Sequence, residues 1–311
     1  MADRMKQGGA ASAALSIGLL LAGLPASQAW ADCGKVDKEL RAAVSERAVD
    51  RFPDLHKRLL SEPTCDGAYR GRVGRVLALA TLKQLQEEAG SPKGPFPLEQ
   101  LKLAATFGKP WQVMNALGDA LYANEDWAAA VKAYEVAIDD IRDTGATPKA
   151  PPQTVEMRLA RRTFQARALA PGHVVTRRFR GRPSGLSDPQ FRTYKAESVP
   201  VPIRFASGET ALTRASQQAA HDMLAFLTDR GAKTVRLIGH TDPSGSETEQ
   251  AEISEARAAA VKAYLVAQGF TGRIEIVGKG ASQRYQPDDG FDHSPEQRNA
   301  FDRRVEYQVV E

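Results

Sequence analysis

Four short runs of the chain between residues 196 and 311 have the period of β-strands. They are residues 199–205, 234–238, 274–276 and 305–309. In three of them apolar residues alternate with proline, polar or charged residues, and TVRLI at 234–238 is a branched run bounded by glycines, which is typical of a buried strand. Because Pro200 and Pro202 cannot donate hydrogen bonds to a ladder, the first strand is expected at a sheet edge.

Two longer segments between these strands have the period of helices. Residues 211–230 carry apolar side chains at helical spacing and stop at a glycine, and residues 247–268 do the same after a capping box of Ser246 and Glu249. Helices that alternate with strands cover the face of a sheet. The pattern therefore predicts an α/β (α+β) sandwich for residues 196–311.

The preceding region, residues 32–170, is predicted to be an all-α domain. Residues 116–137 resemble one tetratricopeptide repeat, with small residues where two helices approach closely and aromatic residues between them. A lone repeat cannot bury its apolar face, so we expect further helices at 67–88, 98–107 and 154–168 to pack on it. Such a helical stack offers a groove for an envelope protein or peptide, and a purely structural spacer is the alternative.

A basic segment joins the two domains. Residues 171–195 contain Arg177, Arg178, Arg180 and Arg182, followed by Pro, Ser and Gly, and no hydrophobic period runs through them. A solvated linker is the expectation for this segment. Contact with anionic glycan or lipid phosphate is the alternative.

Residues 1–31 have the three regions of a secretory signal peptide. Arg4 and Lys6 precede an apolar run at 10–24, and Ala29-Trp30-Ala31 offers a small-x-small cleavage pattern. The apolar run is shorter than the roughly 20 residues that a membrane span needs. We therefore expect no transmembrane span and a periplasmic protein that starts at Asp32, attached to peptidoglycan, with the inner face of the outer membrane as one expected place.

The two cysteines fit an oxidising compartment. Cys33 and Cys65 are the only cysteines of the chain, and they lack the spacing of a zinc or thioredoxin-type site. A structural disulfide between them is predicted.

Composition narrows the classes of function. The chain has 311 residues, of which 42% are hydrophobic and 26% charged, enough for two folded cores. Its formal net charge of +4 is too small to favour nucleic-acid binding. No cofactor motif or cluster with metal-ligand spacing stands out, so neither a cofactor nor a metal is expected.

The chemistry of a binding site is concentrated on two charged residues. Asp242 lies just past the carboxyl end of the 234–238 strand, where ligands of α/β sheets usually enter. Arg257 shares the apolar stripe of the following helix with Ile253 and Val261, and a guanidinium there needs a partner. Asp242 is the first candidate partner. The pair is either the site of a zwitterionic ligand or an internal salt bridge.

Five motifs are similar to those of a known family. They are VPIRFASG from Val201, GHTDPSG from Gly239, ISEARAAAVKAYL from Ile253, the Gly278-Lys279-Gly280 turn, and DRRVE from Asp302. In this order they resemble the OmpA-like peptidoglycan-binding domain, the periplasmic module of outer-membrane protein A, peptidoglycan-associated lipoprotein and flagellar motor stator proteins. The resemblance covers residues 196–311.

The resemblance implies a site for the diaminopimelate residue of the peptidoglycan stem peptide. Asp242 and Arg257 match the two family residues that grip diaminopimelate, and Thr241 lies in the same turn. Gln250 stands where the family usually has Asn and keeps an amide that can contact the ligand. Arg303 is expected in a secondary binding role or as a structural tie, because Asp302 replaces the family's Asn beside it.

A non-catalytic tether between the cell wall and a helical interaction domain is the function that these features predict. Diaminopimelate carries an ammonium and a carboxylate on one carbon, which suits Asp242 and the planar fork of Arg257. One alternative is a periplasmic assembly scaffold whose helical domain has the main function. The other is a peptidoglycan-modifying enzyme, for which no pair of carboxylates aimed at a cleft is evident.

Overall fold

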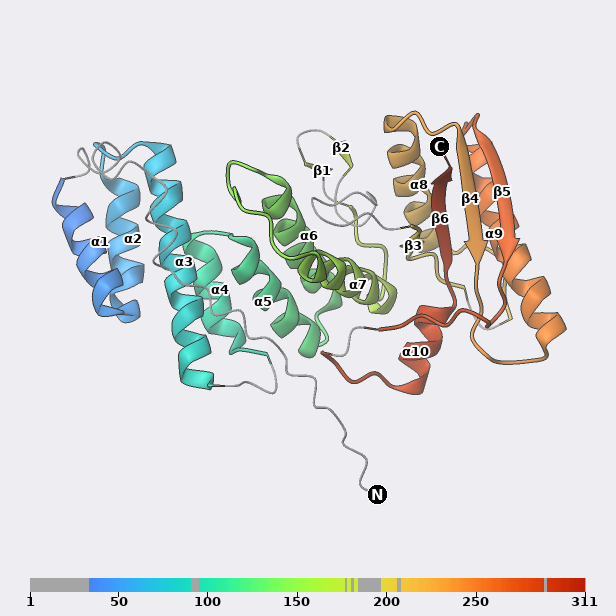
Figure 1. Cartoon of the computed structure of the whole chain (residues 1–311), viewed down its shortest axis with the longest axis horizontal. Coiled ribbons are helices and arrows are strands. Elements are labelled where there is room, and N and C mark those ends of the chain that lie inside the picture. Colours follow the sequence, from blue (N-terminus) through green and yellow to red (C-terminus); the bar gives the residue numbers. More distant parts are fainter. Residues whose placement is uncertain are drawn as a thin grey trace, which may run out of the picture.

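The computed structural model describes residues 34–90, 95–176, 178–179, 182–183, 197–205, 208–287 and 290–310. A series of helices forms one end of the molecule and a four-stranded sheet the other, with α7 and α10 between them (Figure 1). The all-α prediction for the first part and the α/β prediction for the second are both confirmed.

The helical part runs from residue 34 to residue 169. Its elements are α1 (Gly34–Glu46), the 3-10 turn η2 (Val49–Arg51), α2 (Phe52–Ser61), α3 (Gly67–Ala89), α4 (Leu98–Phe107), α5 (Trp111–Ala123), α6 (Trp127–Arg142) and α7 (Gln153–Leu169). The helices expected from the sequence at 67–88, 98–107 and 154–168 are therefore present, with ends that differ by at most one residue.

Close packing of α5 on α6 depends on a glycine. A Cβ atom at Gly118 would lie 2.3 Å from Cε1 of Tyr134, so only glycine allows the ring to lie against the α5 backbone. The Tyr134 hydroxyl then donates to Asp119 at 2.9 Å. Small and aromatic residues thus meet as expected between these two helices, while the likeness to a tetratricopeptide repeat stays a prediction.

The C-terminal part consists of a sheet and three helices. Its elements are β3 (Val199–Val201), α8 (Arg214–Asp229), β4 (Thr234–Gly239), α9 (Glu247–Ala267), β5 (Arg273–Gly278), α10 (Pro295–Asp302) and β6 (Val305–Val310). The strand order is β3-β6-β4-β5, with β4 and β5 parallel and the other neighbours antiparallel. β3 lies at the edge, as its prolines predict.

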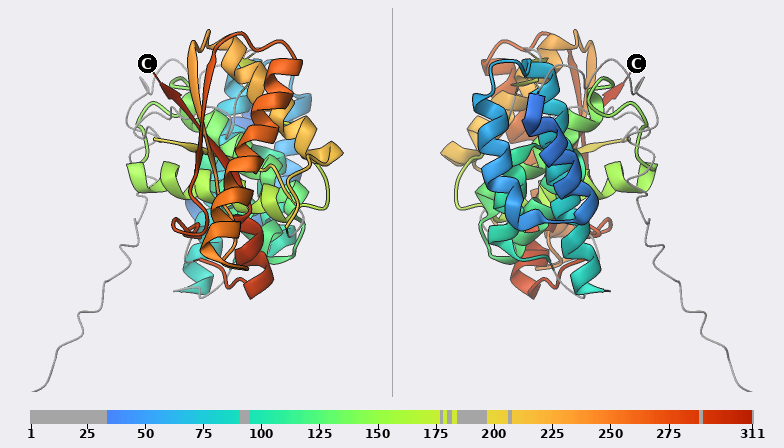
Figure 2. Two further views of the ribbon diagram at one scale, coloured as in Figure 1. Left: turned by 90° about the vertical axis from the view of Figure 1, so that its right-hand side faces the viewer. Right: turned by 90° about the vertical axis from the view of Figure 1, so that its left-hand side faces the viewer.

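One face of this sheet is covered by α8 and α9 (Figure 2). Val235 and Leu237 of β4 are fully buried on that face, whereas Arg236 between them is half-buried on the other face and pairs with Glu275 at 3.0 Å. The alternation of β4 therefore separates a core face from a polar face.

Within the part of the chain that the structure describes, no helix has the length and apolar character of a membrane span.

The segment expected to be a solvated linker is folded at its start. Val174 is buried in the helical core, and the backbone N–H of Thr176 donates to Asp222 of α8 at 3.2 Å. Two short strands, β1 (Arg178–Phe179) and β2 (Arg182–Pro183), then pair antiparallel. Val174 and Thr176 are therefore not solvated as a linker would be, whereas Pro171, Gly172 and Val175 are exposed. For the rest of the segment the linker stays a prediction.

Helix α7 also contributes to two cores. Leu159 and Ala166 are buried among the helical residues, while Phe164 and Ala168 are buried with the residues of the sheet and α8. The two parts of the chain therefore share a packed interface.

The signal peptide of residues 1–31 and Cys33 lie outside the described residues, so the predicted cleavage and the bridge to the buried Cys65 stay predictions.

Candidate functional site

The turn after β4 places Asp242 at the carboxyl end of the sheet. β4 ends at Gly239, where a Cβ atom would lie 1.9 Å from the carbonyl oxygen of Ser254, so glycine lets the strand pass close to α9. The backbone N–H of His240 then donates to Arg304 at 3.0 Å and that of Thr241 to Gly280 at 3.0 Å. These bonds hold the turn between β6 and the turn after β5.

Asp242 is a buried and ionised carboxylate. It accepts from the backbone N–H of Ser244 at 3.0 Å and from Nη1 of Arg303 at 2.9 Å. Burial alone raises the pKa of Asp242, but the hydrogen bonds from Arg303 and Ser244 outweigh it and hold the pKa below the usual value. A carboxylate has about four acceptor positions, so two accepted bonds leave room for a ligand donor.

Arg257 reaches the same region from α9. The capping box of Ser246 and Glu249 starts this helix, as predicted, and Arg257 is 1% exposed within it. Its Nε donates to the Glu209 carbonyl at 3.1 Å and its Nη1 to the His240 carbonyl at 3.3 Å. Burial lowers the pKa of Arg257 to about 10, which still leaves the guanidinium charged at neutral pH.

Four of the five predicted binding residues line one pocket of about 220 Å³. They are Thr241, Asp242, Gln250 and Arg257, and the other lining residues are Gly208, Ser244, Gly245, Glu249 and Ile253. The buried Thr241 hydroxyl has no hydrogen-bond partner among the described residues. Gln250 donates to the Gly245 carbonyl at 3.0 Å and so ties the loop to α9. The pocket therefore combines an anion, a cation and an unsatisfied hydroxyl.

The fifth predicted residue, Arg303, lies behind Asp242 and does not line this pocket. Its Nη1 is 2.9 Å from a carboxylate oxygen of Asp242, and its Nη2 is 2.9 Å from a carboxylate oxygen of Glu296. Burial alone lowers the pKa of Arg303, but the bonds to Asp242 and Glu296 raise it above its usual value. The expectation that Asp242 pairs first with Arg257 is therefore wrong: the ion pair of Asp242 is with Arg303.

Asp302 is directed away from Arg303. It is 1% exposed, and it accepts from Nε of Arg284 at 2.7 Å and from the backbone N–H of Tyr285 at 2.7 Å. Its negative charge is thus neutralised by Arg284 and the following backbone. The departure from the family motif at this position leaves the Asp242–Arg303 pair undisturbed.

Helix α10 and its Glu296 were not anticipated. A signal was present, because Ser294 is followed by Pro295 at the first helical position and by Gln297 three residues after Ser294. In the structure this capping box starts α10, and Arg303 caps its other end. The ion pair between Glu296 and Arg303 could not be predicted from the sequence, because it forms only once α10 brings these two residues together.

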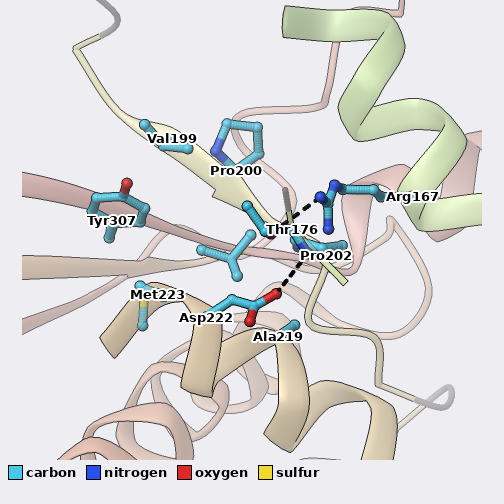
Figure 3. A pocket seen from close by; sticks show the side chains of 10 residues that line it. Arg167, Thr176, Val199, Pro200, Pro202, Ala219, Asp222, Met223 and Tyr307 are labelled. Carbon is cyan, nitrogen blue, oxygen red and sulfur yellow. Dashed lines mark hydrogen bonds between the residues drawn. The ribbon is translucent and has the colours of Figure 1, made fainter. Parts of the chain in front are cut away.

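A second hollow lies between α7 and the sheet edge, and Figure 3 shows Thr176 placed between Arg167 and Asp222 on its wall. Its volume of about 20 Å³ has room for about one water molecule. In the described ranges there is no group of three or more His, Cys, Asp or Glu side chains that could hold a metal ion. The 220 Å³ pocket is therefore the candidate site.

Comparisons with known proteins find a family match for the region that contains this pocket. Residues 204–299 match the model of the OmpA family. Outer membrane protein A of Serratia odorifera is 29% identical over 115 residues, which are 34% of this chain and 47% of that protein. Outer membrane protein A of Bordetella avium is 37% identical over 79 residues, which are 25% of this chain and 38% of that protein. The chain thus spans less than half the length of these two curated relatives.

A solved structure of the cell wall anchor of the T6SS from Pseudomonas aeruginosa is also similar. The two chains are 26% identical in the matched region, which covers 36% of this chain and 78% of the anchor, and the TM-score is 0.29. The match of the family model includes β4, α9 and β5, together with Asp242 and Arg257. Residues 204–299 of this chain form a domain of the OmpA family.

Proposed function

We propose that the C-terminal module binds the diaminopimelate residue of peptidoglycan stem peptides and tethers the protein to the cell wall without catalysis. The observation that carries this proposal is the meeting of Asp242 and Arg257 at one pocket. The family match at residues 204–299 supports an association with peptidoglycan. The finer assignment to diaminopimelate rests on the chemistry of the pocket.

The two charged groups of the ligand have complementary places. The ammonium of diaminopimelate pairs with Asp242, whose carboxylate is ionised at neutral pH. The carboxylate on the same carbon pairs with the guanidinium of Arg257, and the Thr241 hydroxyl offers a further hydrogen bond. Because both protein groups are largely removed from water, each charge-assisted bond is stronger there than at an exposed site.

The proposal places the protein in the periplasm, with the helical part directed to an envelope protein or peptide. The attachment is by non-covalent binding alone, so the cell wall is left unchanged. The assembly scaffold is the alternative in which the helical part acts without the pocket. Co-purification of a partner with protein that carries Asp242→Ala favours that alternative.

The decisive experiment is a calorimetric titration of the mature chain with two stem peptides. One peptide ends in meso-diaminopimelate and the other in lysine, which lacks the second carboxylate. We expect the diaminopimelate peptide to bind about 2 kcal/mol more tightly, the value of one charged hydrogen-bonded contact. Equal affinity for both peptides contradicts the proposed ligand, and release of soluble fragments from whole peptidoglycan contradicts the non-catalytic role.

A further inference from the structure

The pocket is connected to the helical part by side-chain contacts on both sides of α10 and by the backbone of this helix. We propose that Phe291 is a positioning residue: by docking on the helical part it holds α10, and through α10 it holds Arg303 against Asp242. The inference deepens the proposed function, because it makes the affinity of the pocket depend on the helical part of the chain. Its test includes a measurement that needs no ligand.

The first link is the docking of Phe291 on α5 and α7. Its ring lies 4.5 Å from the ring of Tyr122, between centroids, and the guanidinium carbon of Arg162 lies 5.0 Å from its centre. His293 joins the same contact, since its Nε2 is 2.8 Å from the Tyr122 hydroxyl. A residue of the C-terminal part is thereby packed against the helical core.

The second link runs from this contact into α10. The ring of His293 lies edge-on to Phe301 at 5.1 Å, and His293 directly precedes the N-cap Ser294. On the other side Phe301 lies 5.7 Å from Tyr285, which packs 4.8 Å from Phe164 of α7. An eight-residue helix is too short to be stable by itself, so α10 depends on these tertiary contacts.

The third link connects α10 to the pocket. Glu296 in its first turn and Asp242 after β4 hold the two arms of Arg303, which caps the end of α10. A free arginine side chain has about 2 kcal/mol of rotamer entropy, and two carboxylates of different strength order Arg303. Asp242 is buried, whereas the side chain of Glu296 is 78% exposed and its ion pair is the weaker one. If α10 moves, Arg303 loses Glu296 and its hold on Asp242 weakens. The carboxylate that receives the ligand ammonium is then less ordered.

The test compares Phe291→Ala with a matched control, Phe96→Ala. Phe96 is a half-buried phenylalanine that packs on the same helical core just before α4. For both variants in the mature chain, amide hydrogen exchange is measured in α10 and affinity is measured with the diaminopimelate stem peptide. We expect Phe291→Ala to speed exchange in α10 and to weaken binding about tenfold, within the range of couplings between sites. Phe96→Ala should change neither, and Phe291→Tyr should restore both.

A double-variant cycle separates positioning from general loss of stability. In an Arg303→Ala background, Phe291→Ala should weaken binding no further, because the pathway ends at Arg303. Additive losses, unchanged exchange in α10, or faster exchange with wild-type affinity each overturn the proposal. If the wild-type chain does not bind the peptide, the proposed function fails. The positioning role is then decided by exchange of α10 and by the Nε–H signal of Arg303, which must lose its order in Phe291→Ala.

Discussion

At the scale of single residues, the Asp242 carboxylate has one guanidinium group, Arg257, beside it in the pocket lining and another, Arg303, behind it. Asp242 is already paired with Arg303, so in the proposed complex the charge of Arg257 is the one that the ligand carboxylate complements. Burial lowers the pKa of Arg257, while the nearby Asp242 acts in the opposite direction. A zwitterionic ligand adds one charge of each sign and therefore leaves the net charge of the pocket unchanged. Removing these charges from water requires such a balance.

Two substitutions test this distribution of charge. Arg257→Lys keeps the positive charge and loses the planar fork, so we expect it to weaken binding of the diaminopimelate peptide by about 2 to 4 kcal/mol. Asp242→Asn retains an oxygen that can accept from Ser244 and should weaken binding by a similar amount through loss of charge. Titrations beside thermal melts measure both effects. Unchanged affinity with a lowered melting temperature assigns the two residues to folding instead of binding.

A pH effect is expected from His240, which is 1% exposed and does not line the pocket. Burial, with help from Arg304 and Lys279 and against the attraction of Glu306, lowers the pKa of His240 from 6.5 to about 4. Between these values the unfolded chain binds a proton that the folded chain excludes. The resulting stability is complete above pH 6.5 and decreases as the pH falls towards 4.

The expected loss of unfolding free energy over this interval is about 3 to 4 kcal/mol at most, since the pKa falls from 6.5 to about 4 and one pKa unit corresponds to about 1.4 kcal/mol. Chemical denaturation at a series of pH values measures it. His240→Gln should remove this part of the profile, whereas substitution of the exposed His221 by Gln should not. Glu306 lies against His240. Burial alone raises the pKa of Glu306, but Arg304, His240 and Ser198 outweigh it and lower the pKa. The stability that Glu306 contributes is therefore also lost as the pH falls, and this loss begins at a lower pH than that of His240. An unchanged profile in His240→Gln contradicts this account.

At the scale of elements, α7 belongs to both parts of the molecule. Its Leu159 faces the helical core, and its Phe164 lies against Tyr285 and Phe301 of the C-terminal part. Arg204 extends the contact by donating to the Ala170 carbonyl at 2.5 Å. A fragment that begins within the basic segment, after α7, therefore exposes the apolar surface of the sheet domain that Phe164 and Ala168 of α7 cover in the whole chain.

Two fragments measure this dependence. Residues 190–311 lack α7, whereas residues 153–311 include it. We expect the longer fragment to be more stable by about 2 to 3 kcal/mol, the value of burying one large apolar side chain, and to melt at a higher temperature. Phe164→Ala in the longer fragment should remove most of this gain. Equal melting temperatures for the two fragments are evidence that the module folds independently of α7.

Most elements could be predicted because their signals are local. The capping box of Ser246 and Glu249, the branched run of β4 and the prolines of β3 each act within a few residues. The convergence of Asp242 and Arg257 could also be anticipated, because a strand end and the following helix are near neighbours. The partner of Asp242 could not, since Arg303 is 61 residues away and arrives only when β6 pairs with β4.

At the scale of the whole molecule, the series of helices leads without a break in packing to the sheet domain (Figure 1). The pocket lies beyond the contact of α10 with α7, so a partner that binds the helical part can affect the pocket through that contact. Coupling of this kind is reciprocal. A partner that tightens the docking of Phe291 should itself bind more tightly when the pocket is occupied.

The predicted signal peptide and disulfide together provide one prediction for the whole chain. We expect it to begin at Asp32 and to contain a bridge between Cys33 and Cys65 that closes a loop and stabilises the fold by about 3 to 4 kcal/mol. Mass spectrometry of non-reduced protein from the periplasm measures both features together. Cys33→Ala, Cys65→Ala and the double variant should each be destabilised by the loss of this bond, and the two that replace the buried Cys65 also lose its packing. Free thiols or an intact Met1 contradict the prediction.

By itself the sequence determined most of the longer elements, the order of strand and helix in the C-terminal part, and the residues Thr241, Asp242, Gln250 and Arg257 that line the pocket. These depend on side-chain period, caps and turns, which act over short distances along the chain. Only the tertiary structure decided that Arg303 holds Asp242, that Asp302 turns to Arg284, and that α7 joins two cores. Each of these results from packing between segments far apart in sequence, where burial and competing hydrogen-bond partners select one arrangement among several that the residue types allow.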